Sequence, residues 1–123
     1  MERKILVVDD EPAAAEMLKM RLEKNGYAVI VAGSGEECLE KAAKENPDLI
    51  LLDVLLPGAG GLLTCERLKN NAKTKGIPVI MVTALFGDSI KEKGLEVGAK
   101  YLISKPYDPQ DLLWEIEDVL KKK

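Results

Sequence analysis

Residues 47–61 read PDLILLDVLLPGAGG, and this stretch points to the fold class. The run at 49–52 has the length of a strand and is apolar at every position. Uninterrupted apolar runs of this kind are typical of strands that are covered on both faces, as in parallel sheets. Four more short apolar runs lie along the chain, at residues 5–8, 28–32, 79–82 and 101–103.

Segments with helical spacing alternate with these runs. One apolar stripe covers residues 62–72, and the clearest stripe, centred on Ile116, belongs to the last segment. The segment at 89–97 is the weakest, because an interior glycine at position 94 costs up to about 1 kcal/mol in a helix. Residues typical of helix starts precede three of the segments, namely Pro12, Ser34 and the pair Asp108-Pro109.

The order of strand then helix repeats five times along the chain. Such an order predicts an α/β fold with three layers, a doubly wound parallel sheet and right-handed connections. No linker or low-complexity tract interrupts the pattern, so we expect residues 1–123 to form a single domain.

The composition argues against several functional classes. The net charge of −3 and the pI of about 5.1 do not fit a direct nucleic-acid or anionic-membrane surface. The chain has no histidine, which excludes Ser-His catalysis and His-ligated zinc. There is neither a signal-peptide pattern nor an apolar stretch long enough for a bilayer, so we expect a cytoplasmic protein. Cys38 and Cys65 lack metal-site spacing, and we expect them to be reduced and buried.

Chemically active side chains follow four of the five predicted strands. Asp9 and Asp10 follow the run at 5–8, and Asp53 follows the run at 49–52. Thr83 follows the fourth run, and Lys105 comes just after the fifth. Because ligands of open α/β sheets bind beyond the carboxyl ends of the strands, we expect these side chains to converge at one edge.

Three carboxylates at neighbouring strand ends repel one another unless a cation neutralises them. Mg²⁺ fits this demand, since it prefers oxygen ligands and takes one or two carboxylates together with a phosphate oxygen. A carboxylate can also attack phosphorus and form an aspartyl-phosphate. The set Asp9, Asp10, Asp53, Thr83 and Lys105 therefore indicates metal-assisted phosphoryl transfer, a reaction that depends on positioning and charge neutralisation.

Four segments together resemble the receiver domains of two-component response regulators, including the single-domain chemotaxis-type regulators. They are ILVVDDEP at 5–12, PDLILLDVLLPGAGG at 47–61, IPVIMVTA at 77–84 and GAKYLISKPYDPQDL at 98–112. The resemblance covers essentially the whole chain. It implies a flavodoxin-like (βα)5 fold with strand order 2-1-3-4-5.

The resemblance also implies roles for individual residues. Asp53 would be the phosphoacceptor, and Asp9, Asp10, Asp53 and the backbone carbonyl of Leu55 would hold Mg²⁺ or Mn²⁺. Asp10 would be the more direct ligand, with Asp9 acting partly through water. Thr83 would be the switch hydroxyl and Lys105 the phosphate-contacting lysine. A cis peptide between Lys105 and Pro106 would aim the lysine into the site.

The sequence departs from the family pattern at three positions. Gly60 replaces an aspartate that is common before the third helix, and Leu55 stands where Met or Asn is frequent. The switch aromatic usually stands three residues before the lysine, where this chain has Leu102; Tyr101 is one residue earlier. Because a one-residue shift would turn the strand over, we expect Leu102, rather than Tyr101, to fill the switch pocket.

Trp114 lies on the side of the last predicted helix opposite the apolar stripe. It is either an ordinary exposed side chain or part of a partner or dimer surface. In the resembling family, the face formed by the fourth helix, fifth strand and fifth helix is a usual output surface.

The expected function is that of a signalling receiver, not an enzyme. A sensor histidine kinase or phosphotransfer protein would donate the phosphoryl group to Asp53, and a downstream protein effector, or a homodimer through the output surface, would read the result. A phosphorylation-independent interaction module on the same fold is an alternative. An aspartyl-phosphate phosphatase is disfavoured, because Leu55 occupies the position where such enzymes carry a second carboxylate.

Overall fold

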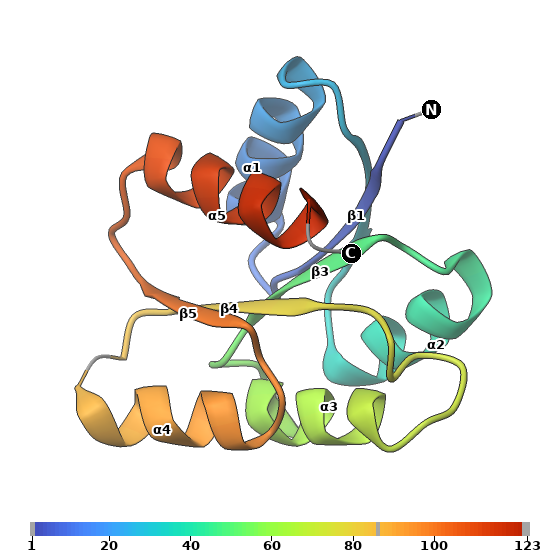
Figure 1. Ribbon diagram of the computed structural model, residues 1–123, viewed down its shortest axis with the longest axis vertical. Helices are drawn as coiled ribbons and strands as arrows, with labels where there is room; N and C mark the ends of the chain where they lie inside the picture. The colour runs from blue at the N-terminus through green and yellow to red at the C-terminus, as the bar shows by residue number, and fades with distance from the viewer. Residues whose placement is uncertain (1, 86, 122–123) are drawn as a thin grey trace.

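A computed structural model describes residues 2–85 and 87–121, in which five strands alternate with five helices (Figure 1). The strands are β1 (Lys4–Val8), β2 (Ala28–Ala32), β3 (Leu49–Asp53), β4 (Val79–Thr83) and β5 (Tyr101–Ser104). The helices are α1 (Pro12–Lys24), α2 (Gly35–Glu45), α3 (Gly60–Lys69), α4 (Asp88–Glu96) and α5 (Pro109–Lys121).

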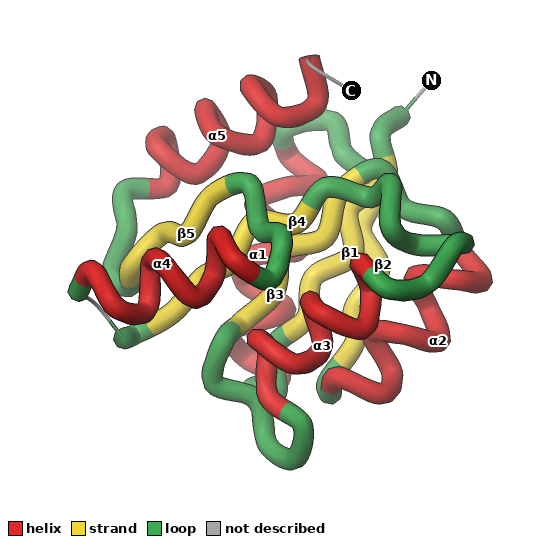
Figure 2. Tube along the Cα trace, turned by 60° about the horizontal axis from the view of Figure 1, so that its bottom comes forward, coloured by secondary structure: helices red, strands yellow, loops and turns green. Residues whose placement is uncertain are grey.

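The strands form one parallel sheet in the order β2-β1-β3-β4-β5, which confirms the expected topology. Helices α1 and α5 cover one face, and α2, α3 and α4 cover the other, so the sheet lies between two helical layers (Figures 1 and 2). Val8 in β1 lies beside Leu52 in β3, and Thr83 in β4 lies beside Ser104 in β5. This register brings the carboxyl ends of the central strands to one edge.

The sheet separates two hydrophobic cores. In β1, Ile5 and Val7 pack in the core under α1 and α5, while Leu6 and Val8 pack in the core above α2, α3 and α4. Both sets are almost completely buried. Successive side chains of a strand point to opposite faces, so a strand with two buried faces is apolar at every position.

The predicted helix starts are confirmed. Pro12 occupies the first turn of α1. The Ser34 hydroxyl accepts a hydrogen bond of 3.1 Å from the backbone N–H of Glu37 and caps α2. At the start of α5, the Asp108 carboxylate accepts a hydrogen bond of 2.8 Å from the N–H of Gln110. Each of these oxygens satisfies an N–H that has no partner within the helix.

Helix α3 ends before Ala72, earlier than the apolar stripe indicated. The side chain of Asn71 accepts a hydrogen bond of 2.9 Å from the N–H of Lys73, and the buried Thr74 hydroxyl donates one of 2.7 Å to the carbonyl of Leu68. Such local side-chain bonds compete with helical ones, so the chain turns here.

Cys38 in α2 and Cys65 in α3 are free and buried, as expected. Burial raises the pKa of the Cys38 thiol to about 12 and that of Cys65 to about 11. Both thiols are therefore protonated at neutral pH and behave as small apolar groups.

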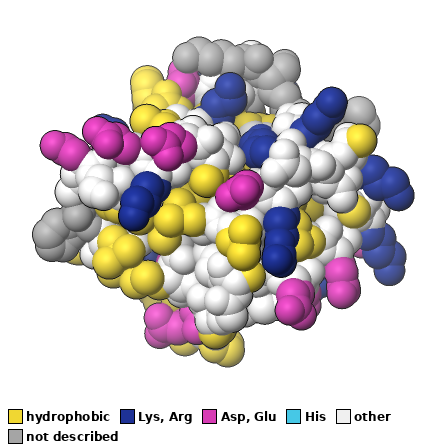
Figure 3. All heavy atoms as spheres, turned by 90° about the horizontal axis from the view of Figure 1, so that it is seen from below, with side chains coloured by type: hydrophobic (Ala, Val, Ile, Leu, Met, Phe, Trp, Pro, Cys, Tyr) yellow, Lys and Arg dark blue, Asp and Glu magenta, His cyan; other side chains and the backbone are white. Residues whose placement is uncertain are grey.

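The surface over α2, α3 and α4 mixes charged and apolar side chains (Figure 3). Large apolar residues of the described chain that remain substantially exposed are Met17, Met20, Leu55, Leu63, Leu85, Leu95 and Trp114. Among the described residues, none of the helices combines the length and the apolar character that crossing a bilayer requires.

Candidate functional site

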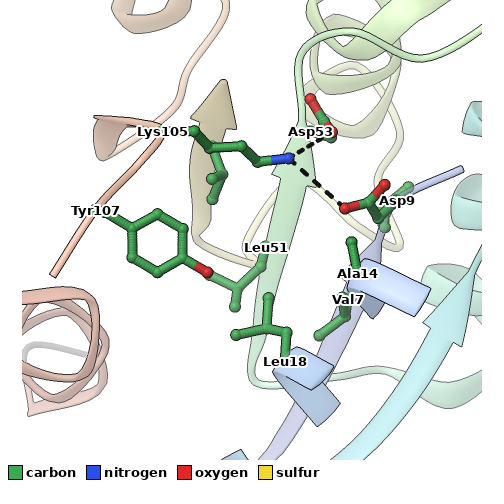
Figure 4. Close-up of a pocket in the computed structure, with 10 residues that line it drawn as sticks. Val7, Asp9, Ala14, Leu18, Leu51, Asp53, Lys105 and Tyr107 are labelled. Atoms are coloured by element: carbon green, nitrogen blue, oxygen red, sulfur yellow. Dashed lines mark hydrogen bonds and ion pairs between the residues drawn. The ribbon is translucent and has the colours of Figure 1, made fainter. Parts of the chain in front are cut away.

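The carboxyl edge of the sheet brings together the chemically active residues that the sequence indicated. Asp9 follows β1, Asp53 ends β3, Thr83 ends β4 and Lys105 follows β5. Because β1, β3, β4 and β5 are consecutive in the sheet, these four residues come from neighbouring strands. Figure 4 shows Lys105 pointing across the edge toward Asp53 and Asp9.

Lys105 bridges two of the carboxylates. Its Nζ donates a hydrogen bond of 3.1 Å to Asp53 Oδ2 and lies 3.7 Å from Asp9 Oδ2. Partial burial by itself lowers the pKa of the Lys105 amine, but the hydrogen bond that Lys105 donates to Asp53 and the charges of both carboxylates outweigh it. The net pKa is raised, so this ammonium is charged at neutral pH. The peptide between Lys105 and Pro106 is cis.

Two backbone hydrogen bonds fix the side chains that end β3 and β4. The N–H of Leu55 donates to Asp53 Oδ1 over 3.0 Å, and the N–H of Leu85 donates to Thr83 Oγ1 over 3.0 Å. Asp53 is 8% exposed and Thr83 is completely buried. A small opening to solvent therefore leads to the Asp53 carboxylate, while the hydroxyl beside it is covered.

Asp9, Asp10 and Asp53 form a cluster of oxygen donors. One carboxylate oxygen of each lies within 4.8 Å of the others. Asp10 is exposed, and Asp9 and Asp53 are more enclosed. Oxygen donors at these separations fit a hard divalent cation, which keeps several waters and takes only a few protein ligands. Lys105 supplies a single positive charge to this cluster of three carboxylates.

Gly61 allows α3 to begin directly against the end of β3. A Cβ atom at this position would lie 2.2 Å from the carbonyl oxygen of Asp53 and 2.6 Å from the Cα of Val54. The N–H of Gly61 donates a hydrogen bond of 2.8 Å to the Val54 carbonyl. Gly61 thus packs against the strand that carries Asp53, a role that its sequence context does not indicate.

Tyr107 is a second residue that the sequence reasoning did not assign to the site. It lines the same cavity as Asp9, Asp53 and Lys105 (Figure 4). The sequence offers one sign that Tyr107 lies at the site, namely its position two residues after Lys105.

The residues predicted for a switch or output surface lie on different faces. Leu102 packs in the core toward α4, where a Cβ at Gly94 would lie 2.9 Å from its Cδ1. Tyr101 faces α5 instead, and its hydroxyl donates a hydrogen bond of 2.6 Å to Asp118. Leu102, rather than Tyr101, therefore occupies the α4 side of β5. Trp114 is 61% exposed on α5.

Comparison with known proteins identifies the family. The family model described as the response regulator receiver domain matches residues 5–117. The chain is 41% identical over 122 residues to the alkaline phosphatase synthesis transcriptional regulatory protein PhoP of Bacillus subtilis, an alignment that covers 99% of this chain and 50% of that protein.

Solved structures agree with the sequence comparison. The chemotaxis protein CheY4 of Vibrio cholerae has a TM-score of 0.91 and 32% identity, over 97% of this chain and 99% of that one. A CheY-like receiver domain protein of Methanospirillum hungatei has a TM-score of 0.92 and 34% identity, over 99% of this chain and 96% of that one.

The chain spans about half the length of curated relatives such as PhoP of Bacillus subtilis and PhoB of Escherichia coli. The matches cover nearly all of this chain and include the residues of the acidic pocket. The chain therefore belongs to the response regulator receiver domain family, whose members are signalling modules rather than classical enzymes.

Proposed function

We propose that Asp53 accepts a phosphoryl group from the phosphohistidine of a sensor kinase or phosphotransfer protein. One observation carries the proposal: the carboxylates of Asp9, Asp10 and Asp53 meet the Lys105 ammonium at a single edge of the sheet. The family supports the same assignment.

The transfer would proceed by direct attack. An oxygen of Asp53 attacks phosphorus, the bond between phosphorus and the donor nitrogen breaks, and its electron pair returns to the imidazole ring. Lys105 then exchanges its contact with Asp53 Oδ2 for a contact with a phosphoryl oxygen. Asp9, Asp10, Asp53 and the carbonyl of Leu55 would hold Mg²⁺ or Mn²⁺, which when bound neutralises charge on the phosphoryl oxygens.

Thr83 would couple the phosphoryl group to the rest of the domain. Its hydroxyl accepts a hydrogen bond from the N–H of Leu85. When the Thr83 side chain rotates so that its hydroxyl donates to a phosphoryl oxygen, the hydroxyl oxygen moves away from the Leu85 N–H and that hydrogen bond is lost. A change in the population of two arrangements of Leu85 and α4 would then follow. Leu102, not an aromatic ring, would fill the space on the α4 side.

Phosphorylation by a small donor tests this function. The protein is incubated with acetyl phosphate and Mg²⁺ and its intact mass is measured. We expect one phosphoryl adduct with Mg²⁺, and none when a chelator removes the cation. An unchanged mass under both conditions would refute the proposal.

We expect Asp10→Asn to weaken Mg²⁺ binding by about tenfold or more, which corresponds to about 1.4 kcal/mol or more, because a cation ligand loses its charge. Isothermal titration calorimetry with MgCl₂ measures the affinity. Asp88→Asn, at the exposed start of α4, removes the same charge from a carboxylate that is not part of the cluster and serves as the control. Equal affinities for the two variants would contradict the assigned metal site.

The face formed by α4, β5 and α5 is the proposed output surface, for a protein effector or a second copy of the chain. Among the described residues of this face, Trp114 is the most exposed large apolar side chain. Aromatic anchors contribute strongly to interfaces, so we expect Trp114→Ala to weaken phosphorylation-dependent association about tenfold without changing the phosphorylation rate. Sedimentation analysis of phosphorylated samples measures the strength of this association, and Leu63→Ala on α3 serves as the control. Association that is unchanged by Trp114→Ala would remove this residue from the surface.

A further inference from the structure

A cavity of about 60 Å³ lies behind Asp53, on the side of the sheet covered by α1 and α5. Its walls are mainly apolar, and four residues with polar groups also line it: Asp9, Asp53, Lys105 and Tyr107. A water molecule needs roughly 10–15 Å³ of such space and two to four polar partners. The cavity therefore has both the room and the polar groups that ordered water requires.

Tyr107 lines both this cavity and a neighbouring groove at the surface. A more open groove between α1 and the segment after β5 is also lined by Ala14, Leu18, Lys105 and Tyr107, all of which line the cavity as well. The half-buried Tyr107 ring thus borders both spaces.

The Tyr107 hydroxyl points into this apolar surrounding. Figure 4 shows it beside Leu51 and Leu18, with the interactions of Lys105 drawn to Asp53 and Asp9 and none drawn to Tyr107. Burial is the main cause that raises the pKa of this phenol, so the hydroxyl stays protonated and able to donate. Among the described residues this hydroxyl has no hydrogen-bond partner, and it is not sealed off from solvent, so water can reach it and take its hydrogen bond.

The Lys105 ammonium also has a hydrogen-bond donor that the described carboxylates do not use. An ammonium carries three N–H donors, and its described partners are two carboxylate oxygens, at 3.1 Å on Asp53 and 3.7 Å on Asp9. The third donor is free for an acceptor in the cavity that Lys105 lines. Water that accepts from Lys105 and from Tyr107 would fix the direction of the ammonium.

We propose that this cavity is an ordered-water site and that Tyr107 is a positioning residue, which holds the water against Lys105. The structural part of this proposal stands on the cavity alone. Its kinetic part rests on the proposed phosphorylation of Asp53, because Lys105 must be oriented to meet the incoming phosphoryl group.

Tyr107→Phe tests the proposal, since it removes the hydroxyl and keeps the ring that lines the cavity. Crystal structures of the wild type and the variant at high resolution should show an ordered water within hydrogen-bond distance of Tyr107 Oη in the wild type, and its loss or displacement in the variant. A wild-type cavity without water density overturns the site, whether or not the protein is phosphorylated.

Kinetics with acetyl phosphate and Mg²⁺ test the positioning role. We expect Tyr107→Phe to lower the phosphorylation rate at saturating donor about threefold to tenfold, which corresponds to the loss of one hydrogen bond. The donor concentration that gives half the maximal rate should stay unchanged. Tyr27→Phe is the matched control, because Tyr27 precedes β2 at the opposite edge of the sheet. Wild-type kinetics for Tyr107→Phe would overturn the positioning role. A wild type that is never phosphorylated would instead refute the proposed function and leave the crystallographic test intact.

Discussion

Asp53→Asn is expected to abolish the phosphoryl adduct completely. The amide that replaces the carboxylate is a poor nucleophile toward phosphorus, and the substitution also removes one oxygen donor and one negative charge from the acidic cluster. Intact mass spectrometry after incubation with acetyl phosphate and Mg²⁺ measures the result. The wild type should gain one phosphoryl group and the variant none.

Asp111→Asn provides the control for this experiment. Asp111 is an exposed carboxylate in the first turn of α5, and its replacement by Asn makes the same chemical change at a residue that is not part of the cluster. This variant should be phosphorylated like the wild type. An adduct that persists in Asp53→Asn, or one that disappears in both variants, would contradict the assignment of Asp53.

Gly61→Ala is expected to destabilise the domain by about 3 kcal/mol or more, because the added methyl group would collide with backbone rather than with a side chain that can move. It would meet the Asp53 carbonyl oxygen and the Val54 Cα at distances that no packed Cβ tolerates. The collision is relieved only if α3 shifts away from β3. Urea denaturation, followed by circular dichroism, measures the loss in the free energy of unfolding.

Gly76→Ala shows what the same substitution does without a collision. Nothing lies within 4 Å of a Cβ at Gly76, and its backbone is outside the left-handed region. Its effect should stay within about 1 kcal/mol, and it can be stabilising because alanine restricts the unfolded chain. A Gly61→Ala protein as stable as Gly76→Ala would show that α3 does not pack on β3 as described.

The sequence predicted the site because its chemistry lies at strand ends. The apolar runs place Asp53 and Thr83 at the last residues of β3 and β4, and the rule for open sheets then sends them to one edge. The alternation of a strand also predicted that Leu102 and Tyr101 face opposite sides, and β5 places them so. Both arguments depend only on the period of a strand, which residue types define well.

Other features depend on contacts between distant segments and could not be read from local patterns. The apolar stripe included Ala72, but the side chains of Asn71 and Thr74 form local hydrogen bonds that end α3 earlier. Nothing in the residue types around Tyr107 indicates that it lines a cavity behind Asp53, because that depends on how α1 lies beside the segment after β5. The demand for glycine at position 61 likewise arises from the approach of α3 to β3.

The proposed function requires that the phosphoryl group resides on the carboxylate at the end of β3. Borohydride reduces an aspartyl-phosphate to homoserine, so treatment of the phosphorylated protein followed by peptide sequencing in the mass spectrometer locates the modified residue. We predict homoserine at position 53 and unmodified aspartate at positions 9 and 10. Homoserine at either of those positions, or at none of the three in a protein that carries the adduct, would show that Asp53 is not the phosphoacceptor.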